Sequence, residues 1–285
     1  MESVLRIILS RKGFDSQYGG VPSPILPDGS LAPLPIGDNR SVVSYGDIQR
    51  RGHCLGDLAE QMTRGRVCRD HRAHLDPDLD ENALPRHPDW RPSFGQEGSS
   101  LGHLRNQGVS AGDLFLFFGW FRATEVRRGT LVYQRNARPV HLIWGWLRIG
   151  EHYDCPDLPT PLRTWAAHHP HLQPNRAEPN TLFIAADTIE LGGRSLPGAG
   201  IFPCQTASRT LTENNDALSR WRLPAWMHPK TLQATLSYHQ DPDRWFERDA
   251  DWCALQSVGK GQEFVLTAQD PTLPQRWLTQ LFADL

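Results

Sequence analysis

The sequence lacks several features that would place it in a common class of protein. No apolar run approaches the roughly 20 residues of a membrane-spanning helix, and the N-terminus has no basic-then-apolar secretory signal. Only three of the 30 basic residues are lysines (Lys12, Lys230 and Lys260), and the net charge is -2. This charge excludes a protein that coats nucleic acid through excess positive charge. We therefore expect a cytoplasmic protein that does not bind membranes.

Recognised motifs of metal and nucleotide sites are also missing. The five cysteines are scattered and include no CxxC pair, which argues against a disulfide framework and a structural zinc ribbon. The sequence contains no GxxxxGK[ST], GxGxxG or HEXXH pattern. Any chemistry must therefore come from residues that these motifs do not describe.

The chain is instead rich in turn-forming residues and short apolar runs. Its 23 prolines and 24 glycines predict short helices. β-Branched and aromatic runs predict strands, which in chain order are residues 4–9, 112–122, 130–135, 140–152, 181–187 and 188–191. The segments 112–122 and 140–149 are apolar on both faces, so we expect them to pair as central strands of a meander that includes 130–135.

Short helices are predicted around these strands. One or two fall within 44–62, one spans 99–107 with Ser99 or Ser100 as its cap, and an amphipathic one spans 274–285. The polar segment 64–95 reads as an ordered loop. Repeated strand–helix–strand units are absent, so the predicted class is α+β, with a mainly antiparallel β core, short peripheral helices and long ordered loops. We expect a single domain over 1–285, with the β core around 112–191.

The first candidate site follows the first predicted strand. Arg11, Asp15, Ser16 and Ser23 lie in a long loop rich in glycine and proline. An arginine fork and backbone N–H groups at a strand end suit a phosphate, and Asp15 suits a base or a metal ligand. The alternative is a turn in which Asp15 and Ser16 cap backbone groups.

The second candidate site is a divalent metal centre. His71, His74, Asp76 and Asp78 combine imidazole and carboxylate groups, which suit iron, manganese or zinc. Asp15 or His103 could complete the ligand set. A solvated loop accounts for the same residues, and we expect that a second histidine cluster is such a loop (His168, His169 and His171).

Two further groups could contact a nucleobase. Gln96 and His103, near a glycine-rich turn, are of the types that read a polar base edge, and His103 is also a candidate acid or base. Trp120 belongs to an aromatic group in which one or two rings could stack on a base. The alternatives are a turn followed by a capped helix for the first group, and core packing for the second.

Several long segments together resemble one family. These are SRKGFDSQYGGVPSPILPDG, HLDPDL, FGQEGSSLGHLRNQGVSAGDLFLFFGWFR, HLIWGWLRIGE, GAGIF at 198–202, WRLP at 221–224 and GQEFV near the end. They resemble the nucleotide modification associated domain 3 family over nearly the whole chain. The resemblance implies a place in a base-modification system, with other proteins of that system as partners. The resemblance implies that the following residues are motif positions of the family: Arg11, Asp15, Ser16, Ser23, His74, Asp76, Asp78, Gln96, His103 and Asp113.

Residues 112–152 also resemble PUA-like domains, which implies a small barrel that binds modified bases or RNA. Two functions therefore remain open. The first is an enzyme that acts on a nucleobase or nucleotide, in a pocket between the N-terminal loop and the His/Asp loop, with Asp15, Arg11 and His103 as catalytic residues. In it Ser16, Ser23, Gln96 and Trp120 would bind the substrate. The second is a noncatalytic reader that binds a modified base, a nucleotide or a flipped DNA base.

Overall fold

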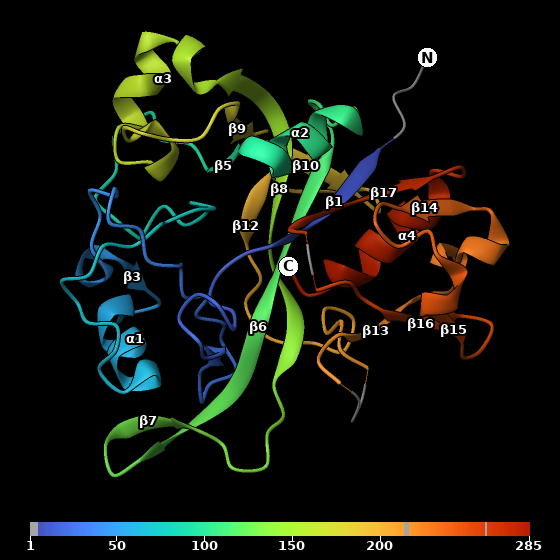
Figure 1. The fold of residues 1–285 in the computed structure, drawn as a ribbon, viewed down its shortest axis with the longest axis horizontal. Coiled ribbons are helices and arrows are strands. Elements are labelled where there is room, and N and C mark those ends of the chain that lie inside the picture. Colours follow the sequence, from blue (N-terminus) through green and yellow to red (C-terminus); the bar gives the residue numbers. More distant parts are fainter. Residues whose placement is uncertain (1–4, 214–216, 260) are drawn as a thin grey trace.

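The fold is built around one large mixed sheet, described here from a computed structural model. The structure describes residues 5–213, 217–259 and 261–285. The main path of paired strands runs β14-β17-β1-β6-β8-β9-β5, and β2, β7 and β12 pair off this path. Strands from both ends of the chain therefore meet in the middle of the sheet, where β1 lies between β17 and β6 (Figure 1).

The bounds of the elements follow in chain order. The large sheet contains β1 (Arg6–Arg11), β2 (Ser23–Ile25), β5 (Ser93–Glu97), β6 (Leu114–Arg127), β7 (Thr130–Tyr133), β8 (Val140–Asp154), β9 (Asn180–Ala185), β12 (Ala199–Ile201), β14 (Ala234–Leu236) and β17 (Glu263–Ala268). Smaller sheets contain β3 (Gln49–Arg50), β4 (His53–Cys54), β10 (Thr188–Leu191), β11 (Arg194–Pro197), β13 (Arg220–Pro224), β15 (Trp245–Glu247) and β16 (Trp252–Gln256). The α-helices are α1 (Leu55–Thr63), α2 (Gly98–Asn106), α3 (Thr160–Trp165) and α4 (Thr272–Leu281).

The predicted pairing of the two most apolar strands is confirmed. β6 and β8 pair antiparallel from Leu114↔Arg148 to Phe121↔Val140, with a bulge between Phe117 and Phe118. The meander is wrong, because β7 does not lie between them. It pairs with the last residues of β6, so that β6, β7 and β8 form one long hairpin with a bent tip, visible at the bottom of Figure 1.

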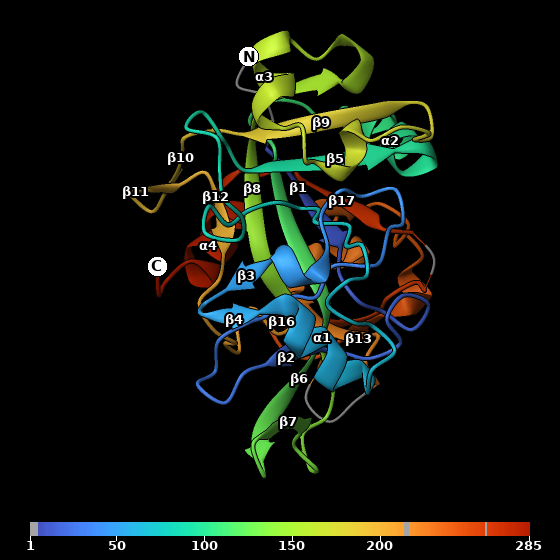
Figure 2. The ribbon, with the colours of Figure 1, turned by 90° about the vertical axis from the view of Figure 1, so that its left-hand side faces the viewer.

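Two layers flank the long strand β6. The segment with α1, β3 and β4 lies on one side of it, and α4 with the sheet β13-β16-β15 lies on the other (Figures 1 and 2). Each side has its own apolar contacts, because Phe14, Tyr45 and Leu58 form a cluster separate from the main core around Phe117 and Trp221. The loops between β4 and β5 run along the first side.

Most predicted helices form, with some differences at their ends. α4 buries Trp277, Leu278 and Leu281 as its amphipathic pattern predicts. Residues 44–62 give a short 3-10 turn, the β3–β4 hairpin and α1. The predicted cap of α2 is wrong: the helix already begins at Gly98, its N-cap is Glu97, and no side chain caps it. Gly98 has φ +60, which lets the chain turn directly from β5 into α2.

These elements confirm the α+β class with a mainly antiparallel core, since only β1–β6 and β2–β6 pair in parallel among the described strands. The PUA-like barrel stays a prediction, as does the single domain over 1–285. None of the helices in the described parts of the chain is long and apolar enough to span a bilayer.

Candidate functional site

The His/Asp loop is held between two segments that fix its backbone. Isolated bridges join Ala73 to Gly37 and Asp78 to Ser93. Between them, Asp76 Oδ1 accepts a hydrogen bond of 2.8 Å from the backbone N–H of Gly95 in β5. The loop therefore lies along β5, and Asp76 is only 8% exposed. This part of 64–95 is ordered, as predicted, but it is not solvated.

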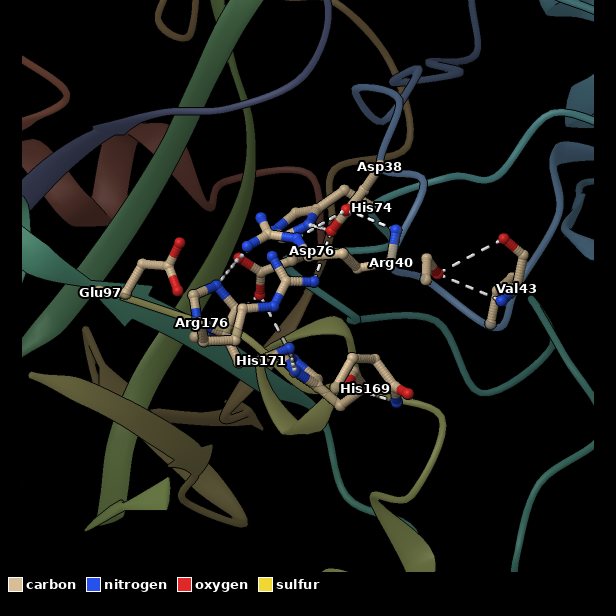
Figure 3. Close-up of polar contacts among 12 residues, drawn as sticks. Asp38, Arg40, Val43, His74, Asp76, Glu97, His169, His171 and Arg176 are labelled. Carbon is tan, nitrogen blue, oxygen red and sulfur yellow. Dashed lines mark hydrogen bonds and ion pairs between the residues drawn. The ribbon is translucent and has the colours of Figure 1, made fainter. Parts of the chain in front are cut away.

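Two imidazoles converge on the second oxygen of Asp76 (Figure 3). His74 Nε2 lies 3.7 Å and His171 Nε2 lies 3.6 Å from Asp76 Oδ2. Within the described residues, His74, Asp76 and His171 are the group whose ligand atoms all lie within 4.8 Å of one another. Ligands about 2.1 Å from a single ion are about 3.0–3.5 Å apart. The three atoms are therefore nearly in position to share one divalent ion.

The other ring nitrogen of each imidazole is held by an outer partner. His74 Nδ1 lies 2.9 Å from Asp38 Oδ2, and His171 Nδ1 lies 2.8 Å from Asn180 Oδ1. The Asn180 amide is oriented by its own N–H donation to the backbone oxygen of His171, also at 2.8 Å. Both partners present acceptor oxygens, so both Nδ1 atoms carry the hydrogen. The Nε2 atom of each ring therefore faces Asp76, and an ion that replaces the proton on Nε2 would meet a ring whose orientation is fixed by its outer partner.

His169 supports the same carboxylate from behind. Its Nε2 lies 3.4 Å from Asp76 Oδ1, and its Nδ1 accepts the backbone N–H of His171 at 3.3 Å. A neutral ring that accepts at Nδ1 carries its hydrogen on Nε2. The hydrogen on His169 Nε2 therefore lies on the side of Asp76 Oδ1, at an N···O distance without hydrogen-bond geometry, and Oδ2 is left to His74 and His171.

The surroundings favour the charged forms of Asp76 and His74 despite the burial of both groups. Burial alone would raise the pKa of Asp76, but polar contacts with His169, His171 and His74 hold the pKa well below its ordinary value. Burial would lower the pKa of His74, yet its bonds to Asp38 and Asp76 raise it. Charge-assisted contacts of His74 with Asp38 and Asp76 thus help to hold the cluster together.

The loop that contains His169 and His171 is not solvated, so the prediction for the cluster 168–171 is wrong. His169 is 1% and His171 is 4% exposed. The reason lies in β5: a Cβ at Gly95 would lie 2.2 Å from the His171 ring, so glycine alone leaves room for this histidine. No local signal in the sequence pairs Gly95 with this histidine-rich segment.

Of the four metal ligands predicted from the sequence, the structure brings His74 and Asp76 together. Asp78 is buried but faces elsewhere: Arg86 binds both its oxygens at 2.8 and 2.6 Å, and His168 Nε2 lies 2.9 Å from Oδ2. His71 is exposed, and its Nδ1 accepts the N–H of Cys68 at 3.3 Å. The structure leaves both outside the converging group.

The N-terminal loop uses its polar groups mainly to hold its own backbone. Arg11 donates to the backbone oxygens of Gly259 and Val258 at 3.1 and 3.2 Å. Asp15 Oδ1 accepts the N–H groups of Gln17 and Tyr18 at 2.8 and 2.7 Å.

The two serines of this loop lie apart. Ser16 is exposed, and the buried Ser23 Oγ accepts the N–H of Leu34 at 3.0 Å. A cavity of about 40 Å³ is lined by Gly13 and by residues 75–80. This volume has room for a few water molecules but not for a base.

A family model described as nucleotide modification associated domain 3 matches residues 6–267. The chain belongs to the nucleotide modification associated domain 3 family. Membership associates it with a nucleotide modification system and confirms the resemblance found in the sequence. Neither a curated protein nor a solved structure matches the chain significantly.

Three of the segments that resemble the nucleotide modification associated domain 3 family meet at one carboxylate. Glu263 Oε1 accepts from Ser10 Oγ at 3.0 Å, Lys12 Nζ at 2.9 Å and Gln96 Nε2 at 2.5 Å. Glu263, in GQEFV, is 1% exposed. The predicted residue Gln96 is therefore an internal partner of Glu263. The GQEFV segment contributes to the family resemblance, but the sequence alone did not indicate a role for its glutamate.

The remaining residues that the sequence predicts as site or motif residues lie apart from the His/Asp cluster. His103, on α2, is 3.0 Å from Ser237 Oγ, and its ring lies 4.4 Å from that of Tyr238. Asp113 accepts backbone N–H groups of Arg6 and Ser110, both at 2.9 Å. Trp120 is half-buried at the pairing position opposite His141 on β8.

Proposed function

We propose that this protein is a metal-dependent enzyme that modifies a nucleobase or nucleotide. The observation that carries the proposal is the convergence of His74 Nε2, His171 Nε2 and Asp76 Oδ2, each from a group with a fixed outer partner. Two imidazoles and one carboxylate suit zinc, iron(II) or manganese(II) and leave coordination positions open. A divalent ion so held supplies Lewis acidity and a site for water or substrate.

The rim of the cluster supports a phosphate-bearing substrate. Arg176 forms a short ion pair with Asp38, and Arg40 lies 3.3 Å from the same carboxylate with a half-exposed side chain (Figure 3). Glu97 borders the opposite side and accepts the N–H of Ala177 at 3.1 Å. A guanidinium on the exposed side of a metal site suits the phosphate of a nucleotide. Together with membership in the family, this favours a nucleotide over an uncharged substrate.

Metal analysis tests the proposal directly. The protein would be purified without chelator, reconstituted with iron(II), manganese(II) or zinc, and compared with His171→Ala and Asp76→Asn. The matched control is His71→Ala, which removes an exposed histidine from the same loop. We expect near-stoichiometric metal in the wild type and control, and a large loss in the two cluster variants. Metal at 100 times its Kd should stabilise the wild type by about 2.7 kcal/mol.

Activity is read separately by mass spectrometry of nucleosides recovered after incubation of the loaded protein with nucleotides or DNA. A new nucleoside mass in the wild type and in His71→Ala, but not in Asp76→Asn, is the expected result. Equal metal content in His171→Ala and His71→Ala would overturn the metal site. Metal without any product over a full set of nucleotides and DNA would overturn the enzyme.

The alternative is a noncatalytic reader of a modified base, with the PUA-like core that residues 112–152 resemble. One observation favours it: a pocket of about 370 Å³ beside α2, lined by the exposed Tyr238. A reader needs such a pocket but no metal. The metal content of the wild type therefore separates the two functions.

A further inference from the structure

The pocket beside α2 lies on the other face of β5 from the His/Asp cluster. Gly95 faces His171, whereas the next side chain, Gln96, reaches Glu263. Successive side chains of a strand point to opposite faces, so the two sites are separated by the strand itself. The pocket is lined by Ser99, Ser100, His103, Tyr238 and Glu263, with Val258, Gly261 and Gln262.

Glu263 is the carboxylate residue that lines this pocket, and one of its two carboxylate oxygens accepts no hydrogen bond from the described residues. Oε1 of Glu263 accepts three donors, but Oε2 is buried and has no hydrogen-bond partner among the described residues. A buried acceptor left unpaired costs free energy. A ligand that brings an N–H donor to this oxygen would remove that cost.

The wall of the pocket is aromatic and held in place. The Tyr238 ring is 53% exposed, yet it lies 4.4 Å from the His103 ring at an interplanar angle of 37° and 6.2 Å from Phe264 at 76°. Tyr238 also has φ +64, a left-handed conformation that is unfavourable for an aromatic residue. Such backbone strain occurs at binding sites, and an exposed, braced ring is a platform for stacking.

We propose that this pocket binds a nucleobase that carries an exocyclic amino group, stacked on Tyr238 and donating to the Glu263 carboxylate. A carboxylate accepts well from the amino group of cytosine, whereas the carbonyl that uracil and thymine present at the same position would face it acceptor to acceptor. The volume of about 370 Å³ is in the range of small-molecule sites. The inference goes beyond the proposed metal chemistry and does not depend on it.

A hydrolase is not supported at the same place. Residues 98–102 have the letters of GxSxG, but Ser100 lies within α2 and not at a strand-to-helix turn. His103 Nε2 is engaged with Ser237 Oγ at 3.0 Å. The residues of the pocket therefore fit recognition better than nucleophilic attack.

Cytidine and uridine are the matched probes, because they differ at the edge that would face Glu263. Calorimetric titration should give a cytidine Kd on the order of ten-fold lower than that of uridine. Tyr238→Ala should weaken cytidine binding by on the order of ten-fold through lost stacking. Tyr18→Ala, which removes a tyrosine of similar exposure in the N-terminal loop, should leave both affinities unchanged.

The Glu263→Gln variant tests the role of the carboxylate. It should bring the Kd values of cytidine and uridine closer together, because an amide can both donate and accept a hydrogen bond. Thermal unfolding checks that this variant folds; if it does not, Tyr238→Ala and the cytidine–uridine ratio still decide. A second titration measures the affinity for single-stranded DNA, and it compares oligothymidylate that contains one cytosine with oligothymidylate alone. Tighter binding to the strand than to cytidine identifies a base in single-stranded DNA as the ligand, and the reverse identifies the free nucleoside.

Failure of this proposal is distinguishable from failure of the metal site. Chelator-treated protein and His171→Ala should keep cytidine binding, and Tyr238→Ala should keep its metal. Equal Kd values for cytidine and uridine would overturn the carboxylate recognition. No binding of either nucleoside or of the cytosine-containing strand would overturn the pocket as a base site.

Discussion

Two groups of histidines in this protein show how neighbouring side chains decide what a buried imidazole does. Near β5, His74, His169 and His171 surround the carboxylate of Asp76. Across the sheet, His141 and His239 lie among aromatic rings, with ring centroids 5.6 Å from Phe118 and 4.7 Å from Phe264. The first group faces charge, and the second faces apolar surface.

The second group consists of neutral rings used as hydrogen-bond acceptors. His141 Nδ1 accepts the indole N–H of Trp221 at 2.9 Å, and His239 Nε2 accepts the N–H of Val258 at 3.1 Å. Burial lowers the pKa of His141 to about 3 and that of His239 to about 4. These histidines are structural, whereas those near Asp76 face a carboxylate and include the imidazole ligands of the proposed metal site.

Asp76 and Asp78 extend the comparison to the carboxylates. Both are buried, but Asp78 is neutralised by the bidentate Arg86 and by His168, with the Trp90 indole N–H at 3.3 Å. Asp76 meets imidazoles only through contacts of 3.4 Å or more. A carboxylate saturated by a guanidinium stabilises the fold, whereas the more widely spaced imidazoles around Asp76 are what the proposed metal site rests on.

The largest effect is expected from removing the partner of the saturated carboxylate. Arg86→Ala leaves Asp78 buried without its cation, which should lower the free energy of unfolding by about 3–5 kcal/mol in urea titrations. Arg69→Ala, which breaks an exposed pair with Asp57, should leave the free energy of unfolding nearly unchanged. Similar losses in the two variants would show that Asp78 does not depend on its guanidinium.

The acid sensitivity of the aromatic group is the next largest effect. The folded pKa values of His141 and His239 lie below the unfolded value of 6.5, so the unfolded chain binds more protons as the pH falls. Their contribution to stability is complete well above pH 6.5 and is lost as the pH falls toward 4 and then 3. By pH 5 the loss should be about 2 kcal/mol for each histidine.

His141→Asn isolates one of these titrations. The asparagine oxygen can still accept from Trp221, but the group no longer binds a proton. Unfolding measured between pH 7 and 5 should therefore lose less stability in this variant than in the wild type. His87→Asn, at an exposed histidine, should follow the wild-type curve. Parallel curves for all three proteins would mean that His141 binds protons equally in the folded and unfolded states, so that burial does not lower its pKa.

The sequence predicted what depends on neighbouring residues in the chain. Buried β1, the pair β6 and β8, and the amphipathic α4 follow from local patterns of apolar residues. His74 and Asp76 were found because they share one loop. The role of His171 was missed because it depends on Gly95 and Asn180, and no local pattern shows which segment a histidine-rich loop will pack against.

Glu263 was missed for the same physical reason. Its partner Gln96 is 167 residues away in the chain, and Ser10 is 253 residues away. Each of these residues alone reads as an ordinary polar side chain beside a strand. Only the sheet order, which brings β17 beside β1, shows that one carboxylate collects them.

The smallest predicted effect tests whether the outer partners prepare the histidines near Asp76 for metal. Asn180→Ala removes the acceptor that fixes His171 Nδ1–H, and loss of such a partner typically weakens metal affinity by about 10–100-fold. Zinc affinity would be measured by competition with a chromophoric chelator. Gln173→Ala, at a nearby glutamine that bonds only backbone oxygens of its own loop, should keep the wild-type Kd.

Asn180→Asp separates orientation of the ring from simple packing. A carboxylate at this position still accepts the Nδ1 hydrogen of His171 but cannot donate to the His171 backbone oxygen, as the amide does. If the acceptor is what matters, zinc affinity in Asn180→Asp should return close to that of the wild type. An aspartate variant as weak as the alanine variant would show instead that the backbone of the 169–171 segment, and not the tautomer of His171, limits metal binding. In that case the imidazoles near Asp76 would differ from those of His141 and His239 in the groups that they contact, but not in how firmly an outer partner fixes the orientation of the ring.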